Sequence, residues 1–317
     1  MTHHSMTVAG IDTGKAELHV HLLPSDETFV VKNTAEGVAA LVARCRKAGV
    51  ARAVIEATSI YHRAAARALA DAGIETAVVQ PRQSRAFAQA VLQWAKSDAI
   101  DAWVLARFAQ VIDAARPLAP RQIEAFSEAL AFIEHLEART AWLKTSRERF
   151  ADRRLLKSID ADIKRLERSR KAHLRTLEAS LRKDDGLAQR LDLLLSIPCI
   201  AERTALGLLI RMPELGSITR EQAASLVGLA PVVRDSGNAK GERHIYGGRA
   251  RVRKTLFMAA FTGAMQWNRE LKACYRRLLA RGKHHTEAVV ACARKLLIFA
   301  NTVLARKTPW IKTEVMP

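Results

Sequence analysis

Two aspartates, Asp98 and Asp101, stand three residues apart in the run WAKSDAIDAWVLA, among small and apolar side chains. On a helix, side chains at this spacing share a face, with their Cβ atoms roughly 5–6 Å apart. Two carboxylates held so close repel each other, and a cation bound between them offsets the repulsion. An isolated pair of this kind more often lies on a solvated helix face. The pair therefore predicts a cation site only if other parts of the chain supply further ligands.

Two more acids accompany predicted strands near the start of the chain. Asp12 lies just past a strand predicted over 7–11, and Glu56 belongs to the end of a strand predicted over 52–57. In open α/β sheets, functional side chains gather at the carboxyl ends of strands. We therefore expect both acids to converge with the aspartate pair into one cluster of four carboxylates. For Asp12 alone, capping a turn is an equally good explanation.

A four-carboxylate cluster predicts a particular chemistry. Ligand sets made only of oxygen suit Mg²⁺ or Mn²⁺. Two such ions can hold the attacking and leaving oxygens of a phosphodiester during displacement. We therefore expect the four acids to be both metal ligands and catalytic residues in phosphodiester chemistry.

The elements that must position these acids follow an α/β pattern. Three strands come first, and helices then alternate with strands, which predicts a mixed sheet within a domain over 1–116. Strands are predicted over 7–11, 17–23, 28–33, 52–57 and 76–81, and helices over 35–48 and 59–73, before the helix that carries the aspartate pair.

A rival interpretation comes from GIDTGK at 10–15, which resembles the first phosphate loop of actin-like sugar kinases. The signal is short, and the sequence has no second glycine-rich phosphate loop to complete such a site. A sugar kinase also has no evident use for the net charge of +19.

That charge is concentrated toward the end of the chain. Lys and Arg number 51 against 32 Asp and Glu; the balance is +2 over 1–116, +5 over 117–182 and +12 over 183–317. A near-neutral front and a strongly basic rear predict a polyanion bound mainly at the rear. A membrane surface is a poorer partner, because no segment is a basic helix with a clean apolar face.

The expected location is the cytoplasm. The four cysteines, at 45, 199, 274 and 292, show no metal-binding or paired spacing, which indicates reduced structural thiols. The first residues lack an apolar signal core, and no uninterrupted run of 18 apolar residues occurs.

The middle of the chain predicts a helical spacer over 117–182. Residues 121–182 contain neither Gly nor Pro, and apolar residues recur three and four apart. This pattern indicates two long amphipathic helices forming an antiparallel or intermolecular coiled coil. Basic side chains along it could contact nucleic acid or simply face water.

The rear domain, 183–317, is predicted to be helical. Helix, tight turn and helix around Ile197-Pro198-Cys199 resemble a helix-hairpin-helix, whose turn offers backbone amides to phosphates.

Ser236 follows in a loop of Gly and Asn, and 240–283 holds twelve basic and two acidic side chains. A lone serine of this kind is by default a turn residue. Beside a phosphate-binding patch it also has what a nucleophile toward a phosphodiester requires. The expected phosphate-binding residues are Lys240, Arg243, Arg249, Arg251, Arg253 and Lys254.

Several motifs in order resemble the transposases of insertion sequence family 110. They are GIDTGK, IEATSIYH, KSDAIDA, the hairpin IPCIAERTA with LVGLAP, DSG, and GG followed by RVRKTLFMAA. The resemblance extends from about Val8 to Leu304. The chain departs from the family pattern at Ser59-Ile60, where a pair of glycines is usual, and at the hairpin, where Cys199 and Ala201 replace glycines.

The resemblance implies a ribonuclease-H-like (RuvC-like) domain with acids at Asp12, Glu56, Asp98 and Asp101, and a nucleophilic serine at Ser236. It also implies donor and target DNA and a structured bridge RNA that pairs with both. Because the exchange of two duplexes needs several nucleophiles, we expect a homo-oligomer, a dimer assembling to a tetramer. The function expected is a recombinase that cuts and rejoins DNA through a covalent phosphoserine. Two alternatives stay open: a hydrolytic RuvC-like junction nuclease, which needs only the acids, and a non-catalytic nucleic-acid-binding protein, which needs only the basic rear.

Overall fold

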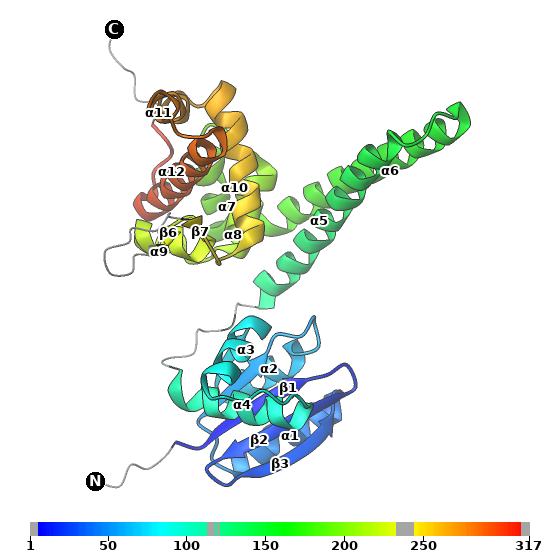
Figure 1. Cartoon of the computed structure of the whole chain (residues 1–317), viewed down its shortest axis with the longest axis vertical. Helices are drawn as coiled ribbons and strands as arrows, with labels where there is room; N and C mark the ends of the chain where they lie inside the picture. Colours follow the sequence, from blue (N-terminus) through cyan, green and yellow to red (C-terminus); the bar gives the residue numbers. More distant parts are fainter. Residues whose placement is uncertain (1–5, 113–117, 119–120, 233–243, 312–317) are drawn as a thin grey trace. The chain divides into compact units, whose positions relative to one another are not determined.

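The chain divides into two compact units, Met1–Pro120 and Arg121–Pro317. The computed structural model describes residues 6–112, 118, 121–232 and 244–311 (Figure 1). The two long helices predicted as a spacer fall within the second unit.

The first unit is built on a mixed five-stranded sheet in the order β3-β2-β1-β4-β5. Strand β1 pairs antiparallel with β2 and parallel with β4, so it lies at the centre of the sheet. The bounds are β1 Val8–Thr13, β2 Glu17–Leu23, β3 Glu27–Lys32, β4 Arg52–Glu56 and β5 Glu75–Val79. This architecture confirms the predicted mixed α/β sheet and is compatible with a ribonuclease-H-like domain.

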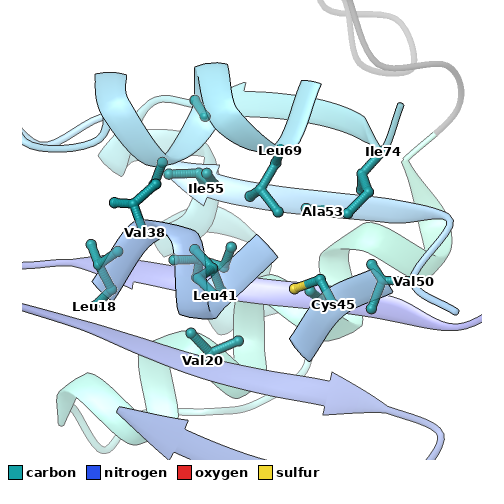
Figure 2. Close-up of a cluster of buried hydrophobic side chains, with 14 of the residues drawn as sticks. Leu18, Val20, Val38, Leu41, Cys45, Val50, Ala53, Ile55, Leu69 and Ile74 are labelled. Carbon is teal, nitrogen blue, oxygen red and sulfur yellow. The ribbon is translucent and has the colours of Figure 1, made fainter. Parts of the chain in front are cut away.

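Helices cover both faces of this sheet. Helices α1 (Ala35–Lys47) and α2 (Arg63–Asp71) bury one face, where Leu41 and Cys45 of α1 meet Val20 of β2 (Figure 2). Helix α4 (Asp98–Val111) buries the other face, and α3 (Pro81–Ala90) packs against α4. Since both faces are covered, β1 is buried along almost its whole length.

One helix prediction needs correction, and one helix was not predicted. The helix expected from Ser59 begins only at Arg63, because Ser59 takes a left-handed backbone (φ 48°) and residues 58–62 form turns. Ser59 is where the family pattern has a glycine, the residue that adopts this conformation at least cost. Helix α3 was not predicted, although Pro81 in its first turn and the capping box between Gln80 and Gln83 mark its start.

In the second unit, α5 (Arg121–Arg147) and α6 (Arg153–Leu181) pack along each other in antiparallel directions. Ion pairs cross between them, Lys144 with Glu167 at 2.7 Å and Arg147 with Asp160 at 2.7 Å. The predicted long helices are therefore present, and they pair within one chain.

The rest of the second unit is a helical cluster with one short ribbon of two strands. Its elements are α7 Asp185–Leu195, α8 Glu202–Arg211, α9 Arg220–Val227, β6 Pro231–Val232, β7 His244–Ile245, α10 Ala250–Thr262, the π-helical segment η1 Gly263–Trp267, α11 Arg269–Ala280 and α12 His285–Arg306. In the turn between α7 and α8, Cys199 is left-handed (φ 75°), as suits a position where glycine is usual. Its thiol packs against Gly263, where a Cβ would lie 2.6 Å from the Cys199 Sγ.

Helix α12 is the one helix in the described part of the chain whose length and composition would allow it to cross a membrane. Buried helices of a protein core share these properties, and α12 buries ten side chains, among them Val289, Leu296 and Leu297, inside the second unit.

Candidate active site

The sheet supplies two of the four predicted acids. Side chains alternate between the faces of a strand. Val8 and Val54 are buried beneath α4, and Asp12 and Glu56 follow them at even spacing on β1 and β4. Both acids therefore lie on the α4 face. The parallel register pairs Ile11 with Ile55, so Asp12 and Glu56 are the next residues along adjacent strands. Asp12 lies within β1, one residue before its end, rather than just past it as predicted.

Helix α4 supplies the other two acids, at its first turn. The Ser97 side chain accepts a hydrogen bond from the Ile100 backbone N–H (3.3 Å) and fixes the start of the helix. Asp98 and Asp101 lie one helical turn before the buried residues Ala102 and Leu105. The aspartates therefore continue the face of α4 that packs on the sheet.

Gly10 lets α4 come close enough for this arrangement. A Cβ on Gly10 would lie 2.0 Å from the Ala106 nitrogen and 2.1 Å from the Ala102 oxygen. The helix backbone therefore rests directly on β1, two residues before Asp12.

The four carboxylates act on one another electrostatically. The pKa of Asp12 is raised from 3.8 to about 6; burial is the largest cause, followed by the negative charges of Glu56, Asp101 and Asp98. The pKa of Asp101 is also raised, mainly by burial and further by Glu56 and Asp98, while Lys96 and Arg85 lower it. The structure thus brings the four predicted acids within mutual electrostatic reach.

Two neighbours that sequence reasoning missed bind these acids. The Ser84 hydroxyl of α3 donates a short hydrogen bond to Glu56 Oε2, and it lies 3.0 Å from the Pro81 carbonyl. His19 of β2 lies opposite Asp12 in the β1–β2 register, and its Nε2 is 3.4 Å from Asp98 Oδ2. No sequence signal identified Ser84, because the helix that carries it was not predicted.

The donor set suits a hard divalent cation, since every predicted ligand atom is a carboxylate oxygen. Among the described residues, however, no three His, Cys, Asp or Glu side chains are close enough to hold one ion as they stand. Carboxylates that repel one another separate without a cation, and burial, followed by the charges of the other three acids, raises the pKa of Asp12. The residues therefore fit a metal site whose ligands must draw together around the ion.

The predicted nucleophile and two predicted phosphate ligands, Ser236, Lys240 and Arg243, lie outside the described residues. The strands on either side are described: β6 and β7 pair antiparallel, with Val232 opposite His244. The Cα atoms of Val232 and His244 therefore lie about 5 Å apart.

Two of the predicted phosphate ligands are engaged inside the second unit. The two terminal nitrogens of the Arg249 guanidinium pair with the Glu214 carboxylate, at 2.6 and 2.8 Å. Arg249 also donates to the Arg211 carbonyl. Arg253 donates to the carbonyls of Val227 and Gly247. The Arg253 contacts join α9 to the Gly247-Gly248 turn, and the Arg249 contacts hold the start of α10 against the end of α8.

Arg251 and Lys254 are placed differently. Arg251 is 64% exposed and lies 3.2 Å from Glu134 of α5. Lys254 lines a groove between α5, α8 and α10 together with Thr204 and Met258. These two cations remain the better candidates for contact with phosphate.

Comparison with known proteins gives two consecutive family matches. Residues 9–150 match the IS110 DEDD profile, described as "Transposase". Residues 191–276 match a second profile, described as "Transposase IS116/IS110/IS902 family". Together the two matches cover well over half of the chain.

The chain belongs to the IS110 family of transposases. A curated relative, the "Insertion element IS110 uncharacterized 43.6 kDa protein" of Streptomyces coelicolor, is 36% identical over 104 residues. That match covers 32% of this chain and 25% of the relative, so the chain spans about a quarter of the length of the curated relative it matches. In this IS110-family chain the first match contains all four acids, and the second contains the β6–β7 ribbon.

Proposed function

We propose that this chain is the DNA transposase of a mobile element, which cuts and rejoins donor and target DNA. The observation that carries this proposal is the convergence of four acidic residues from β1, β4 and the first turn of α4 on one face of the sheet. Family membership supports DNA as the substrate and a divalent metal as the cofactor.

Asp12, Glu56, Asp98 and Asp101 would hold Mg²⁺ or Mn²⁺. When bound, such an ion stabilises the charge that develops on the phosphodiester oxygens. The chain's own carboxylates hold the ion, and Ser84 fixes the orientation of Glu56 through the hydrogen bond described above.

Ser236 would be the nucleophile. Its hydroxyl oxygen forms a bond to phosphorus while the serine proton passes to a base. The bond from phosphorus to the leaving sugar oxygen breaks, and that oxygen takes up a proton and leaves as a sugar hydroxyl. The resulting phosphoserine conserves the energy of the broken bond. A sugar hydroxyl of another strand then displaces the serine, so rejoining needs no ATP.

Target choice would be delegated to a structured bridge RNA that pairs with donor and target DNA, as the family resemblance implies. In RNA-guided systems the protein reads backbone and shape while base pairing reads sequence. The net charge of +19 supplies the positive surface that such a protein needs. RNA that co-purifies with the chain and has segments complementary to both DNAs would support this part of the proposal, whereas a strand exchange that proceeds unchanged without RNA would exclude it.

The test of the chemistry is a strand-exchange assay on two separate variants, Ser236→Ala and Asp101→Asn, with Mg²⁺ and with excess EDTA. We expect wild type to form a covalent protein–DNA adduct only with metal, Ser236→Ala to form none, and Asp101→Asn to lose most of its activity while remaining folded. Cleavage that needs the acids but not Ser236 would indicate the hydrolytic nuclease. DNA binding with no chemistry in wild type would indicate a non-catalytic protein.

A further inference from the structure

An exposed apolar surface lies beside the acid pocket, on the segment between α3 and α4. Val91 is 39% exposed, Leu92 75% and Trp94 65%. Three large apolar side chains in four residues face solvent, although the same unit buries most of its other apolar residues.

The backbone of this segment is strained at Leu92. Leu92 is left-handed (φ 59°) and follows the end of α3, where the Leu92 N–H bonds the Gln89 carbonyl and the Gln93 N–H bonds the Ala88 carbonyl. This is the hydrogen-bond pattern of a Schellman motif, in which glycine usually takes the left-handed position. A leucine there costs backbone energy and gains no burial. Strain of this kind is typical of binding sites.

Two cations line the pocket next to this surface. Arg85 and Lys96 share the pocket wall with Glu56 and Asp101, and Lys96 is two residues from Trp94. Within the described residues, neither cation forms a hydrogen bond or an ion pair, although both charges act on Asp101. Carboxylates and cations thus line the same pocket.

We propose that residues 91–96 and Arg85 form a docking element for a single DNA strand. Trp94 stacks on an unpaired base, and Arg85 and Lys96 bind a backbone phosphate beside the carboxylates. Aromatic rings next to cations are the usual means by which proteins hold single strands. The free positive charges favour a polyanion over a second protein chain as the occupant. This inference deepens the proposed function and rests on it only for the choice of DNA.

The test is the affinity of the full chain for a fluorescent single-stranded DNA of about 15 nucleotides, measured by anisotropy with EDTA and no added metal, so that chemistry is absent. Trp94→Ala should weaken binding about tenfold, since one stacked base is worth roughly that factor. Trp94→Phe should recover most of the loss. A blunt duplex of equal length should respond less than about twofold, because its bases are already stacked.

The double variant Arg85→Ala/Lys96→Ala should reduce the dependence of log K on log salt by about 1.4, the value for two phosphate contacts to a single strand. Two matched controls should leave affinity and salt dependence unchanged: Trp142→Ala, whose exposed indole is in the second unit, and Arg46→Ala/Lys47→Ala on α1, which covers the opposite face of the sheet. Melting temperatures confirm that each variant is folded.

An equal loss on single strand and duplex, an unchanged salt dependence, or an effect confined to RNA would overturn the inference. A change in sedimentation for Trp94→Ala with unaltered DNA affinity would also overturn it, and would assign the surface to a second copy of the chain. If Trp94→Ala loses single-strand affinity as expected but the wild-type chain never forms a covalent adduct, the docking element is supported and the proposed function is contradicted.

Discussion

At the scale of single residues, Asp12 shows what the acid cluster costs the fold. Its pKa is 3.8 in an ordinary setting and about 6 in the folded chain. Between these values the folded state holds a proton that the unfolded state has released, so stability falls as pH rises through this window. Above about pH 6 Asp12 is charged in both the folded and the unfolded state, and the loss of folding stability reaches its full value. A shift of this size corresponds to about 3 kcal/mol, which solvent screening of a partly exposed carboxylate reduces to about 1 kcal/mol.

We therefore expect Asp12→Asn to be about 1 kcal/mol more stable than wild type at pH 7.5 and equally stable at pH 3.5, where both side chains are neutral. Hydrogen exchange of the β1 amides measures the local free energy of opening. Mg²⁺ should slow this exchange in wild type and not in the variant. Equal exchange of both proteins at pH 7.5 would contradict the burial of a charged Asp12.

Ser84 is expected to act through Glu56, as a positioning residue. Ser84→Ala removes the hydrogen bond to the carboxylate and should lower Mg²⁺ affinity about tenfold, as loss of a ligand's hydrogen-bond partner usually does. Ser84→Thr keeps the hydroxyl and should retain most of the affinity. Calorimetric Mg²⁺ titration checks both, and equal affinities for Ala and Thr would show that Ser84 only packs.

Sequence reasoning located the four acids but not their partners. Asp98 and Asp101 share a face by helical spacing alone, and strand ends predict where Asp12 and Glu56 lie. Ser84 and His19 contact these acids across elements that are distant in sequence. The catalytic and metal-binding roles of the acids, and the role of Ser236, stay predictions.

At the scale of elements, the contact of α4 with β1 depends on the missing side chain of Gly10. Gly10→Ala places a methyl group 2.0 Å from the Ala106 nitrogen, so helix and strand must separate. We expect a loss of about 3 kcal/mol in the stability of the first unit, with faster hydrogen exchange in α4. Gly49→Ala is the control: nothing lies within 4 Å of its Cβ, and only its left-handed backbone (φ 67°) adds a strain of about 1 kcal/mol. Equal losses for both variants would show that α4 does not rest on β1.

Glu134 joins three parts of the second unit. Its carboxylate lies 3.2 Å from Arg203 and 2.7 Å from Arg211 of α8, and 3.2 Å from Arg251 of α10. Glu134→Gln removes the carboxylate that pairs with Arg211, a guanidinium less than one-fifth exposed, while Arg203 keeps its ion pair with Glu137 at 3.1 Å. We expect a loss of about 2 kcal/mol, measured by urea unfolding. The exposed Glu148→Gln should change stability by less than about 0.5 kcal/mol, and an equal effect of both would show that the network contributes nothing.

Periodicity predicted most elements, because strand alternation and helical repeats are local properties. The strand over 17–23 was predicted at its observed bounds, and both long helices are present. Helix α3 was missed because its apolar face is weak and its signals lie in the cap around Pro81. The supercoil of the long helices and the helix-hairpin-helix stay predictions.

At the scale of the whole molecule, the acids and Ser236 belong to different units of the chain. Ser236 has no base placed beside it by sequence, and the acids have no nucleophile except water. The α5–α6 pair, with helices of 27 and 29 residues, is an arm roughly 40 Å long at about 1.5 Å per residue. An arm of this length allows one chain to supply the acids and another the serine.

We therefore expect inactive Ser236→Ala and inactive Asp12→Ala chains, when mixed, to recover part of the adduct formation, because a mixed oligomer assembles one intact site. Adduct formation on a labelled DNA end measures this. As a control, a chain that carries both Ser236→Ala and Asp12→Ala, mixed with the Ser236→Ala chain, should form no adduct, because neither chain has the serine. If subunits are shown to exchange and the mixture still forms no adduct, each chain completes its own site.

The register of β1 and β4 has a consequence for how accurately the acid cluster is held. The backbones that carry Asp12 and Glu56 belong to adjacent paired strands, about 4.8 Å apart, and side-chain substitutions barely alter this backbone spacing. Asp98 and Asp101 are held by side-chain packing of a helix, which shifts readily by tenths of an ångström. The cluster therefore combines a fixed pair with an adjustable pair. A divalent ion held by the four acids would therefore be accommodated mainly by movement of α4 and of the side chains, while the backbones of the two strands keep their spacing.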